Sequence, residues 1–168
     1  MKFKDLLGEG KYLRLVRSGQ WEYVERRNVS GIVAIVALTR KGEIVLVEQM
    51  RPAVGARVVE LPAGLAGDAG AETLESAARR ELLEETGYEA GKLKEIGTFT
   101  PSAGLTSERV TFFLARGARR TGAGGGDGSE KIESFAVALD GVPAFLKTRA
   151  KGGALVDEKV FVGLWFSR

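Results

Sequence analysis

The stretch from residue 61 to residue 88 constrains this chain more than any other, because its second half predicts a helix whose acids turn inward. Thr73 is a typical N-cap, Ala, Leu, Glu and Arg fill the interior, and Gly87 predicts the C-terminal stop. We therefore expect a helix over residues 73–86. At about 100° per residue, one face of this helix is apolar and should pack inward. Its members are Leu74, Ala77, Ala78 and Leu82.

Three glutamates fall on or beside that apolar face. Glu81 and Glu85 lie in the middle of the arc, and Glu84 lies at its edge. Acids at spacings i, i+3 and i+4 repel each other by roughly 0.2–0.5 kcal/mol per pair, and burial adds a cost of desolvation. A hard divalent cation such as Mg²⁺ would remove this cost, because it binds carboxylate oxygens. The alternative is a solvated surface helix, with Glu75 and Arg79 as an i, i+4 pair, and the pattern alone leaves both open.

The absence of two residue types limits the chemistry. The 168 residues include no cysteine and no histidine, which excludes disulfides, thiolate nucleophiles, zinc–thiolate sites and an imidazole base. Any metal should be bound by oxygen, as Mg²⁺ or Mn²⁺. A net charge of +3 without a basic, aromatic-interleaved stripe predicts no nucleic-acid partner. Without a long apolar run or a signal-peptide pattern, we expect a cytoplasmic protein and no membrane partner.

The residues from Glu72 to Tyr88 resemble the signature of the Nudix hydrolases, a family that cleaves nucleoside diphosphates linked to another moiety. The match consists of Glu72, seven further residues, and then Arg80-Glu81-Leu82-x-Glu84-Glu85-x-Gly87-Tyr88. So many fixed positions at fixed spacing make this a specific signal. Seven residues also separate Gly64 from Glu72, more than is usual in the family, so we expect a longer loop before the helix.

The resemblance covers roughly residues 20–166 and implies the Nudix α/β/α sandwich, an α/β fold with a mixed β-sheet. The length predicts one domain, residues 1–168. Strand-like runs occupy residues 11–17, 21–27, 32–38, 44–47, 58–64, 93–100, 110–115 and 135–139, and helix-like runs occupy 142–148 and 157–165. Residues 32–38 and 44–47 should form a hairpin buried on both faces. The N-terminal strands, about 10–29, are candidates for a homodimer contact.

The resemblance also implies a metal site. Its ligands would be the carboxylates of Glu81, Glu84 and Glu85 and the backbone carbonyl of Ala63, with Mg²⁺ as the cofactor and Mn²⁺ as the alternative. Glu84 also counts among the catalytic candidates, together with the salt-bridging residues Arg80 and Glu72. Gly64 would allow the backbone to approach closely.

Substrate contacts are suggested by two further motifs. Glu48-Gln49-Met50-Arg51 resembles the Glu-Gln-x-Arg of the ADP-ribose pyrophosphatase branch, in which the Arg contacts the pyrophosphate; a strand-end salt bridge is the alternative for Arg51. Pro101 and the following Gly-x-Thr-Ser-Glu-Arg strengthen the match to this branch, although a polar loop explains the same residues. Trp21 is a candidate for stacking on a base, or else a core or dimer contact. The remaining candidates are Arg27, Glu60, Gly104 and Glu108.

A Gly-rich tract at residues 121–129 lacks the Gly-Lys-Ser/Thr of a P-loop, and we expect it to be mobile. Glu130, at its far end, is the candidate general base by resemblance, with Glu133 and Asp127 as rivals.

Together these features imply Mg²⁺-dependent hydrolysis of the pyrophosphate bond of ADP-ribose or another nucleoside diphosphate sugar, giving a nucleoside monophosphate and a sugar phosphate. One alternative is a Nudix hydrolase that removes nucleoside triphosphates from the nucleotide pool, against which the 101–109 loop argues. The other is a non-catalytic module that binds nucleotide sugars, against which the intact Arg80-Glu81 and Glu84-Glu85 argue.

Overall fold

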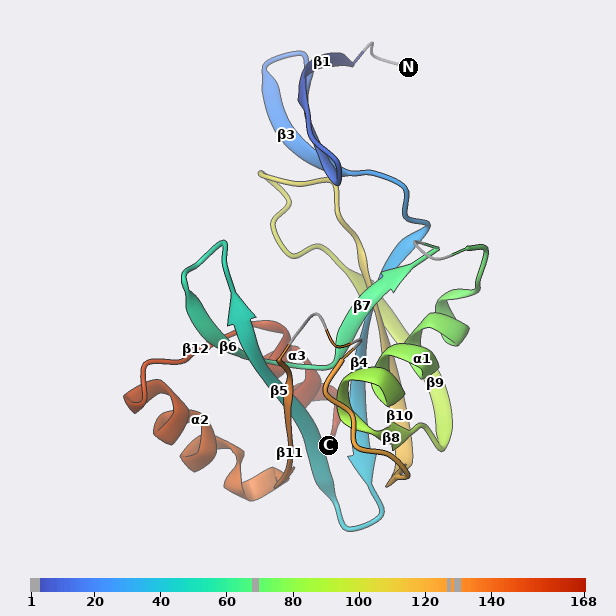
Figure 1. The fold of residues 1–168 in the computed structure, drawn as a ribbon, viewed down its shortest axis with the longest axis vertical. Helices are drawn as coiled ribbons and strands as arrows, with labels where there is room; N and C mark the ends of the chain where they lie inside the picture. The colour runs from blue at the N-terminus through green and yellow to red at the C-terminus, as the bar shows by residue number, and fades with distance from the viewer. Residues whose placement is uncertain (1–3, 68–69, 127, 129–130) are drawn as a thin grey trace.

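A nine-stranded mixed sheet forms the body of the molecule, and a separate three-stranded sheet of N-terminal strands stands at one end (Figure 1). The computed structural model describes residues 4–67, 70–126, 128 and 131–168. The strands are β1 Asp5–Glu9, β2 Leu13–Ser18, β3 Trp21–Arg26, β4 Gly31–Thr39, β5 Glu43–Arg51, β6 Ala56–Glu60, β7 Ala63–Ala66, β8 Tyr88–Glu89, β9 Lys92–Phe99, β10 Val110–Arg120, β11 Glu133–Ala138 and β12 Leu155–Val156. The helices are α1 Leu74–Thr86, α2 Val142–Lys151 and α3 Lys159–Phe166, with a 3₁₀ turn at Leu139–Gly141.

β4 is the central strand, and its residues alternate between two hydrophobic cores. Val33, Ile35 and Ala37 belong to the core under α1, which includes Ala77 and Leu82 of that helix. The intervening residues of β4, Ala34, Val36 and Leu38, belong to the core on the other face, with side chains of α2 and α3. Helices therefore cover both faces of the sheet, and the predicted α/β/α sandwich is confirmed.

The hairpin expected from β4 and β5 forms, and both strands are buried over most of their length. The two strands share a ladder only near their turn, at Leu38↔Ile44, and then separate. β4 pairs with β7 and, in parallel, with β10, whereas β5 pairs with β6 and β11. The chain passes from the strands around β5 to the strands around β4 at Pro62. The carbonyl of Pro62 accepts the amide of Ile35 at 2.8 Å. Residues 58–64 were predicted as a strand that runs into a turn at Pro62 and Gly64. They contain the end of β6 and the start of β7, which have different partners.

α1 begins and ends where its sequence predicts. The Thr73 hydroxyl accepts the amide of Ser76 at 3.1 Å, which satisfies one of the free N–H groups of the first turn. Gly87 ends the helix at φ 72°, and its N–H donates to the carbonyl of Leu83 at 2.8 Å. Ala77, Ala78 and Leu82 are fully buried, so the predicted apolar face is the face that packs on the sheet.

The N-terminal sheet touches the body through few contacts. Val24 of β3 forms a bridge to Thr106, and its backbone exchanges hydrogen bonds with Leu105 and Ser107 at 2.8 and 3.1 Å. β2 and β3 form the predicted hairpin, and β1, which was not predicted, adds a third strand. Many large apolar side chains of this sheet are exposed, including Leu6, Leu13, Leu15 and Trp21, and so is Tyr12 in the β1–β2 connection.

The first part of the Gly-rich tract, which we expect to be mobile, is hydrogen-bonded to the end of α1. The amides of Gly125 and Gly126 donate to the carbonyls of Glu85 and Glu84 at 2.9 and 3.0 Å, at the C-terminal end of the helix. These carbonyls belong to the last turn, where no intrahelical donor is available. None of the described helices is long and apolar enough to cross a membrane.

Candidate active site

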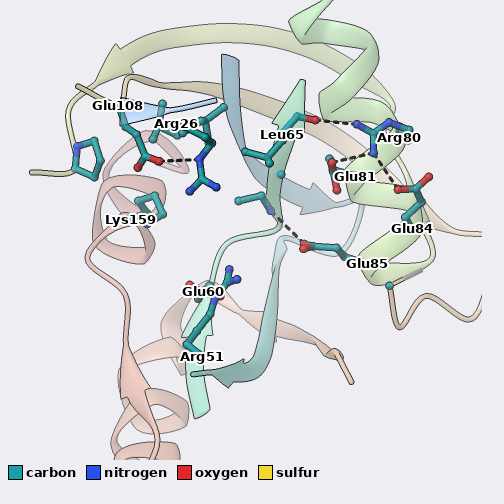
Figure 2. Close-up of a pocket in the computed structure, with 16 residues that line it drawn as sticks. Arg26, Arg51, Glu60, Leu65, Arg80, Glu81, Glu84, Glu85, Glu108 and Lys159 are labelled. Atoms are coloured by element: carbon teal, nitrogen blue, oxygen red, sulfur yellow. Dashed lines mark hydrogen bonds and ion pairs between the residues drawn. The ribbon is translucent and has the colours of Figure 1, made fainter. Parts of the chain in front are cut away.

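A cleft of about 520 Å³ opens between α1, the β6–β7 segment and the start of α3. Figure 2 shows that carboxylates of α1 line one wall, while Arg26, Arg51 and Lys159 come from the other elements that surround the cleft. Acids and cations thus face a common space that is large enough for a small ligand.

Arg80 connects four groups around the acidic wall. Its Nη2 donates to Glu72 and to the carbonyl of Leu65, both at 2.9 Å, and its Nη1 lies 2.8 Å from Glu81 and 3.1 Å from Glu84. The hydrogen bond from Arg80 lowers the pKa of the Glu72 carboxyl, and the same bond raises the pKa of Arg80. The salt bridge expected between Arg80 and Glu72 is therefore present, and the hydrogen bond from Arg80 to Leu65 joins α1 to β7.

Glu81 and Glu85 point toward the sheet. Glu85 is 5 % exposed, and its Oε2 accepts the amide of Ala63 at 3.1 Å. Glu81 lies against Gly64 so closely that a Cβ built on this glycine would come well within 3.0 Å of the carboxylate carbon and both oxygens. Gly64 is required here for space, as the motif predicts. The surface pair of the solvated-helix alternative, Glu75 and Arg79, does form at 2.9 Å, but Glu85 is buried and points inward.

The donor set around this wall fits a hard divalent cation. The carboxylates of Glu81, Glu84 and Glu85 and the residue Ala63 line the same cleft, and oxygen ligands of this kind suit Mg²⁺ or Mn²⁺. As they stand, the described residues form no group of three or more acids that could hold a metal ion. Glu81 and Glu84 are instead drawn to Arg80, so a cation would have to compete with Arg80 for these two carboxylates.

Arg51 and Glu60 form an ion pair in the cleft. Nε and Nη2 of Arg51 both lie 2.8 Å from Oε2 of Glu60, so the pair joins the end of β5 to the end of β6. Burial raises the pKa of the Glu60 carboxyl, and the hydrogen bond from Arg51 opposes this rise. The salt bridge that we considered as the alternative role of Arg51 is therefore present. It holds the guanidinium group of Arg51 at the wall of the cleft.

Glu48, the first residue of the Glu-Gln-x-Arg motif, serves the sheet and not this cleft. It is 1 % exposed and accepts Nε of Arg57 and of Arg149 at 2.6 and 2.5 Å. The hydrogen bond from Arg149 lowers the pKa of Glu48 below its usual range despite burial. A second guanidinium nitrogen of Arg57 reaches Glu133 at 2.6 Å.

The structure gathers most of the predicted site residues and leaves others apart. The predicted residues that line the cleft are Arg51, Glu60, Ala63, Arg80, Glu81, Glu84, Glu85 and Glu108. Glu72 lies behind Arg80. Trp21, Arg27 and Gly104 are not among the described residues of the cleft wall. Arg27 binds Gly10 and Glu9 of the N-terminal sheet, and Trp21, at the start of β3, is 69 % exposed. Glu130 and Asp127 lie outside the residues that the structure describes.

Two cations of the cleft escaped the sequence analysis. Arg26 donates from Nε to Glu108 at 2.8 Å, and Figure 2 shows the other end of its guanidinium directed into the cleft. Arg26 is the last residue of β3 and Arg27 follows it, and successive side chains of an extended chain point to opposite sides. Arg26 therefore lines the cleft, whereas Arg27 binds Gly10 and Glu9. The second missed cation is Lys159, at the first position of α3. The alternation of side chains along β3 could have indicated Arg26 from the sequence. No pattern in the sequence indicated Lys159.

The fold and the acid-lined cleft define a class of protein, an α/β/α sandwich in which a glutamate-rich helix lies against a glycine of the neighbouring strand β7. The model of the NUDIX domain matches residues 29–155, and the chain belongs to this family. It is 33 % identical over 137 residues to a methanol dehydrogenase activator of Bacillus methanolicus, across 81 % of this chain and 71 % of that protein. It is also 46 % identical over 85 residues to the ADP-ribose pyrophosphatase of Bacillus subtilis, a match that covers 51 % of this chain and 45 % of that one.

The fold recurs in solved structures. One of them, described as the crystal structure of an ADP compounds hydrolase, superposes with a TM-score of 0.67 over 86 % of this chain and 80 % of its own, at 16 % identity. At this identity the likeness supports the fold alone. Together with the family match, the relatives confirm the resemblance to the ADP-ribose pyrophosphatase branch.

Proposed function

We propose that this protein hydrolyses the pyrophosphate bond of ADP-ribose or another nucleoside diphosphate sugar, releasing a nucleoside monophosphate and a sugar phosphate. The observation that carries the proposal is the composition of one cleft. Glu81, Glu84 and Glu85 of the signature helix line it together with the guanidinium groups of Arg51 and Arg26.

The chemistry requires negative charge to be held while water attacks phosphorus. A bound Mg²⁺ would neutralise phosphate charge and lower the pKa of a bound water. Arg51 would hold the pyrophosphate, because a planar guanidinium offers paired N–H groups to phosphate oxygens. Arg26 would do the same from the N-terminal sheet, with Glu108 fixing its Nε. Arg80 and Glu72 would keep the acidic wall in place through their salt bridge.

We assign the general base to the end of the Gly-rich tract, with Glu130 as the candidate by resemblance. Of the two rivals, Glu133 is engaged by Arg57 at 2.6 Å and is not among the described residues that line the cleft. This position makes Glu133 the weaker choice, and it leaves Glu130 and Asp127 to be separated by mutation.

We also propose that the protein is a homodimer built through the N-terminal strands. Three strands of five or six residues form a small sheet with few contacts to the body. Such a sheet needs an apolar face packed against something to be stable, and the exposed Leu13 and Leu15 of β2 lie together on one face. In the dimer, a partner strand would cover these side chains, and Trp21 keeps its predicted role as a stacking surface or contact.

A substrate panel tests the function directly. The purified chain is assayed with ADP-ribose, GDP-mannose, UDP-glucose and a nucleoside triphosphate, each with Mg²⁺ and with a chelator, and the released nucleotides are quantified. We expect nucleoside monophosphate from at least one diphosphate sugar, only with the metal. Faster turnover of the triphosphate would favour the pool-cleaning alternative. Binding of the sugars without any turnover would favour the non-catalytic alternative.

A further inference from the structure

Lys159 stands where the cleft meets a second, smaller cavity. This cavity of about 130 Å³ lies between β9, β10 and the start of α3, and its lining includes Phe99, Phe112 and Val162. Pro101, Val110 and Lys159 belong to both cavities. The smaller cavity is therefore a side pocket of the cleft, with Lys159 at the junction.

Asp157 holds the Lys159 side chain in place. Oδ2 of Asp157 lies 2.6 Å from Nζ of Lys159, and Oδ1 accepts the backbone amide of the same lysine at 2.7 Å. Asp157 is itself fixed, because its amide donates to the carbonyl of Val59 in β6 at 2.9 Å. An ammonium group has three N–H donors. In the part of the chain that the structure describes, Asp157 is the one side chain bonded to this Nζ, so two donors are available to a ligand.

The position of Lys159 separates it from the acids of α1. Figure 2 shows it across the cleft from Glu81 and Glu85, with Arg51 and Glu60 on one side and Arg26 and Glu108 on the other. A ligand whose phosphates lie between α1 and the arginines would therefore present one of its ends to Lys159.

The lining and volume of the side pocket indicate which end of the ligand can enter it. The lining contains the acid Glu158 beside aromatic and aliphatic side chains, and Lys159 is the one cation among its described residues. A phosphate group in this pocket would meet apolar surface and a carboxylate, which is costly. At about 130 Å³ the side pocket has a quarter of the volume of the cleft, which is about 520 Å³, so it admits one ring of the ligand while the rest of the ligand stays in the cleft. A single sugar ring fits, because it offers a C–H face to Phe99 and hydroxyl groups to a nearby donor.

We propose that Lys159 is a specificity-determining residue that donates a hydrogen bond to a hydroxyl group of the terminal sugar, the part that leaves as sugar phosphate. Asp157 is its positioning residue. This inference rests on the proposed function, since it assigns one end of the proposed substrate.

Kinetics with two substrates test the assignment. Lys159→Met removes the donor and keeps the aliphatic stem, and Lys147→Met is the matched control, because Lys147 is exposed on α2. The substrates are ADP-ribose and the β-methyl ester of ADP, which has the pyrophosphate but no second sugar. We expect Lys159→Met to raise KM for ADP-ribose about tenfold, as for the loss of one hydrogen bond to a charged group, and to leave KM for the methyl ester unchanged. Lys159→Arg should restore part of the affinity.

Equal effects of Lys159→Met on the two substrates would overturn the assignment, because the lysine would then bind the shared nucleotide. An unchanged KM for ADP-ribose would overturn it as well. Calorimetric binding of both compounds, without metal, keeps the test independent of turnover. If the wild-type chain hydrolyses neither compound, the proposed function fails, whereas the sugar assignment still stands or falls on whether Lys159→Met selectively weakens binding of ADP-ribose.

Discussion

At the residue scale, the space beside Gly64 determines where Glu81 can lie. The carboxylate of Glu81 occupies the volume that a Cβ on Gly64 would need, and Arg80 holds the same carboxylate at 2.8 Å. Gly64 is part of β7, opposite Val33 of the central strand, so its backbone has little freedom to retreat. Even a methyl group at this position must therefore displace Glu81.

We predict that Gly64→Ala lowers kcat by about a hundredfold, which is the cost of misplacing a catalytic group by about 1 Å. The fold should survive, because the collision involves the end of a side chain that can rotate away. Steady-state kinetics and thermal unfolding of the same preparations separate the two effects. Gly8→Ala is the control, since a Cβ on Gly8 meets no described heavy atom within 4 Å. If Gly64→Ala has the same kcat as this control, the position of Glu81 does not matter for catalysis and Glu81 is not a site residue.

Single residues also show how far the sequence predicts the site. The acids of α1 were predictable, because a helix of 13 residues has a period that fixes their phase against the buried alanines. Arg26 was missed in favour of Arg27, because β3 has six residues and one register step exchanges its two faces. Lys159 depends on where α3 docks, and docking is decided by contacts between residues distant in the chain.

At the element scale, the end of α1 is joined to the Gly-rich tract by close backbone packing. The amides of Thr121 and Gly122 both donate to the carbonyl of Gly87, at 2.8 and 3.0 Å. A Cβ on Gly87 would lie within 3.0 Å of backbone atoms of Gly122 and Gly124. The glycines of the tract thus have a structural role that composition could not reveal, because glycine-rich segments usually indicate flexibility.

Comparing two glycine substitutions measures this packing. Gly87 and Gly42 have similar positive φ values, 72° and 77°, so alanine should cost each about 1 kcal/mol of backbone strain. At Gly42, in the β4–β5 turn, a Cβ would meet no described atom within 4 Å. We predict that Gly87→Ala lowers the free energy of unfolding by at least about 1 kcal/mol more than Gly42→Ala, as measured by urea denaturation. Equal losses would mean that the tract does not pack on α1 in solution.

The elements themselves were largely predictable from the sequence. Apolar, β-branched runs predicted β4 and β5, strand-like segments predicted β9, β10 and β11, and capping residues predicted the limits of α1. The division of residues 58–64 into β6 and β7 was not predictable, because it depends on which strand each segment pairs with. The same division creates the gap in which Ala63 and Gly64 face the acids.

At the scale of the whole molecule, the N-terminal sheet has an apolar face that no other part of the described chain covers. Leu13 and Leu15 alternate with Arg14 and Val16 along β2, so both leucines lie on one face, and both are exposed. Val24, opposite Leu15 in the ladder, and Arg26, opposite Leu13, lie on this same face. A face that includes a cleft residue and uncovered leucines is suited to a partner that completes both the sheet and the site.

We therefore predict a dimer of 18.0 kDa chains that Leu15→Lys dissociates, because a charged group on this face would have to be desolvated in the interface. Light scattering coupled to size exclusion gives the mass of each variant. Leu155→Lys is the control, since Leu155 is equally an exposed leucine but lies on β12 in the body. Because Arg26 is on β3, the dissociated Leu15→Lys variant should also have a raised KM for its substrate, with circular dichroism confirming the fold. A wild-type monomer mass would contradict the prediction, and loss of the dimer by Leu155→Lys alone would move the interface to the opposite end of the molecule.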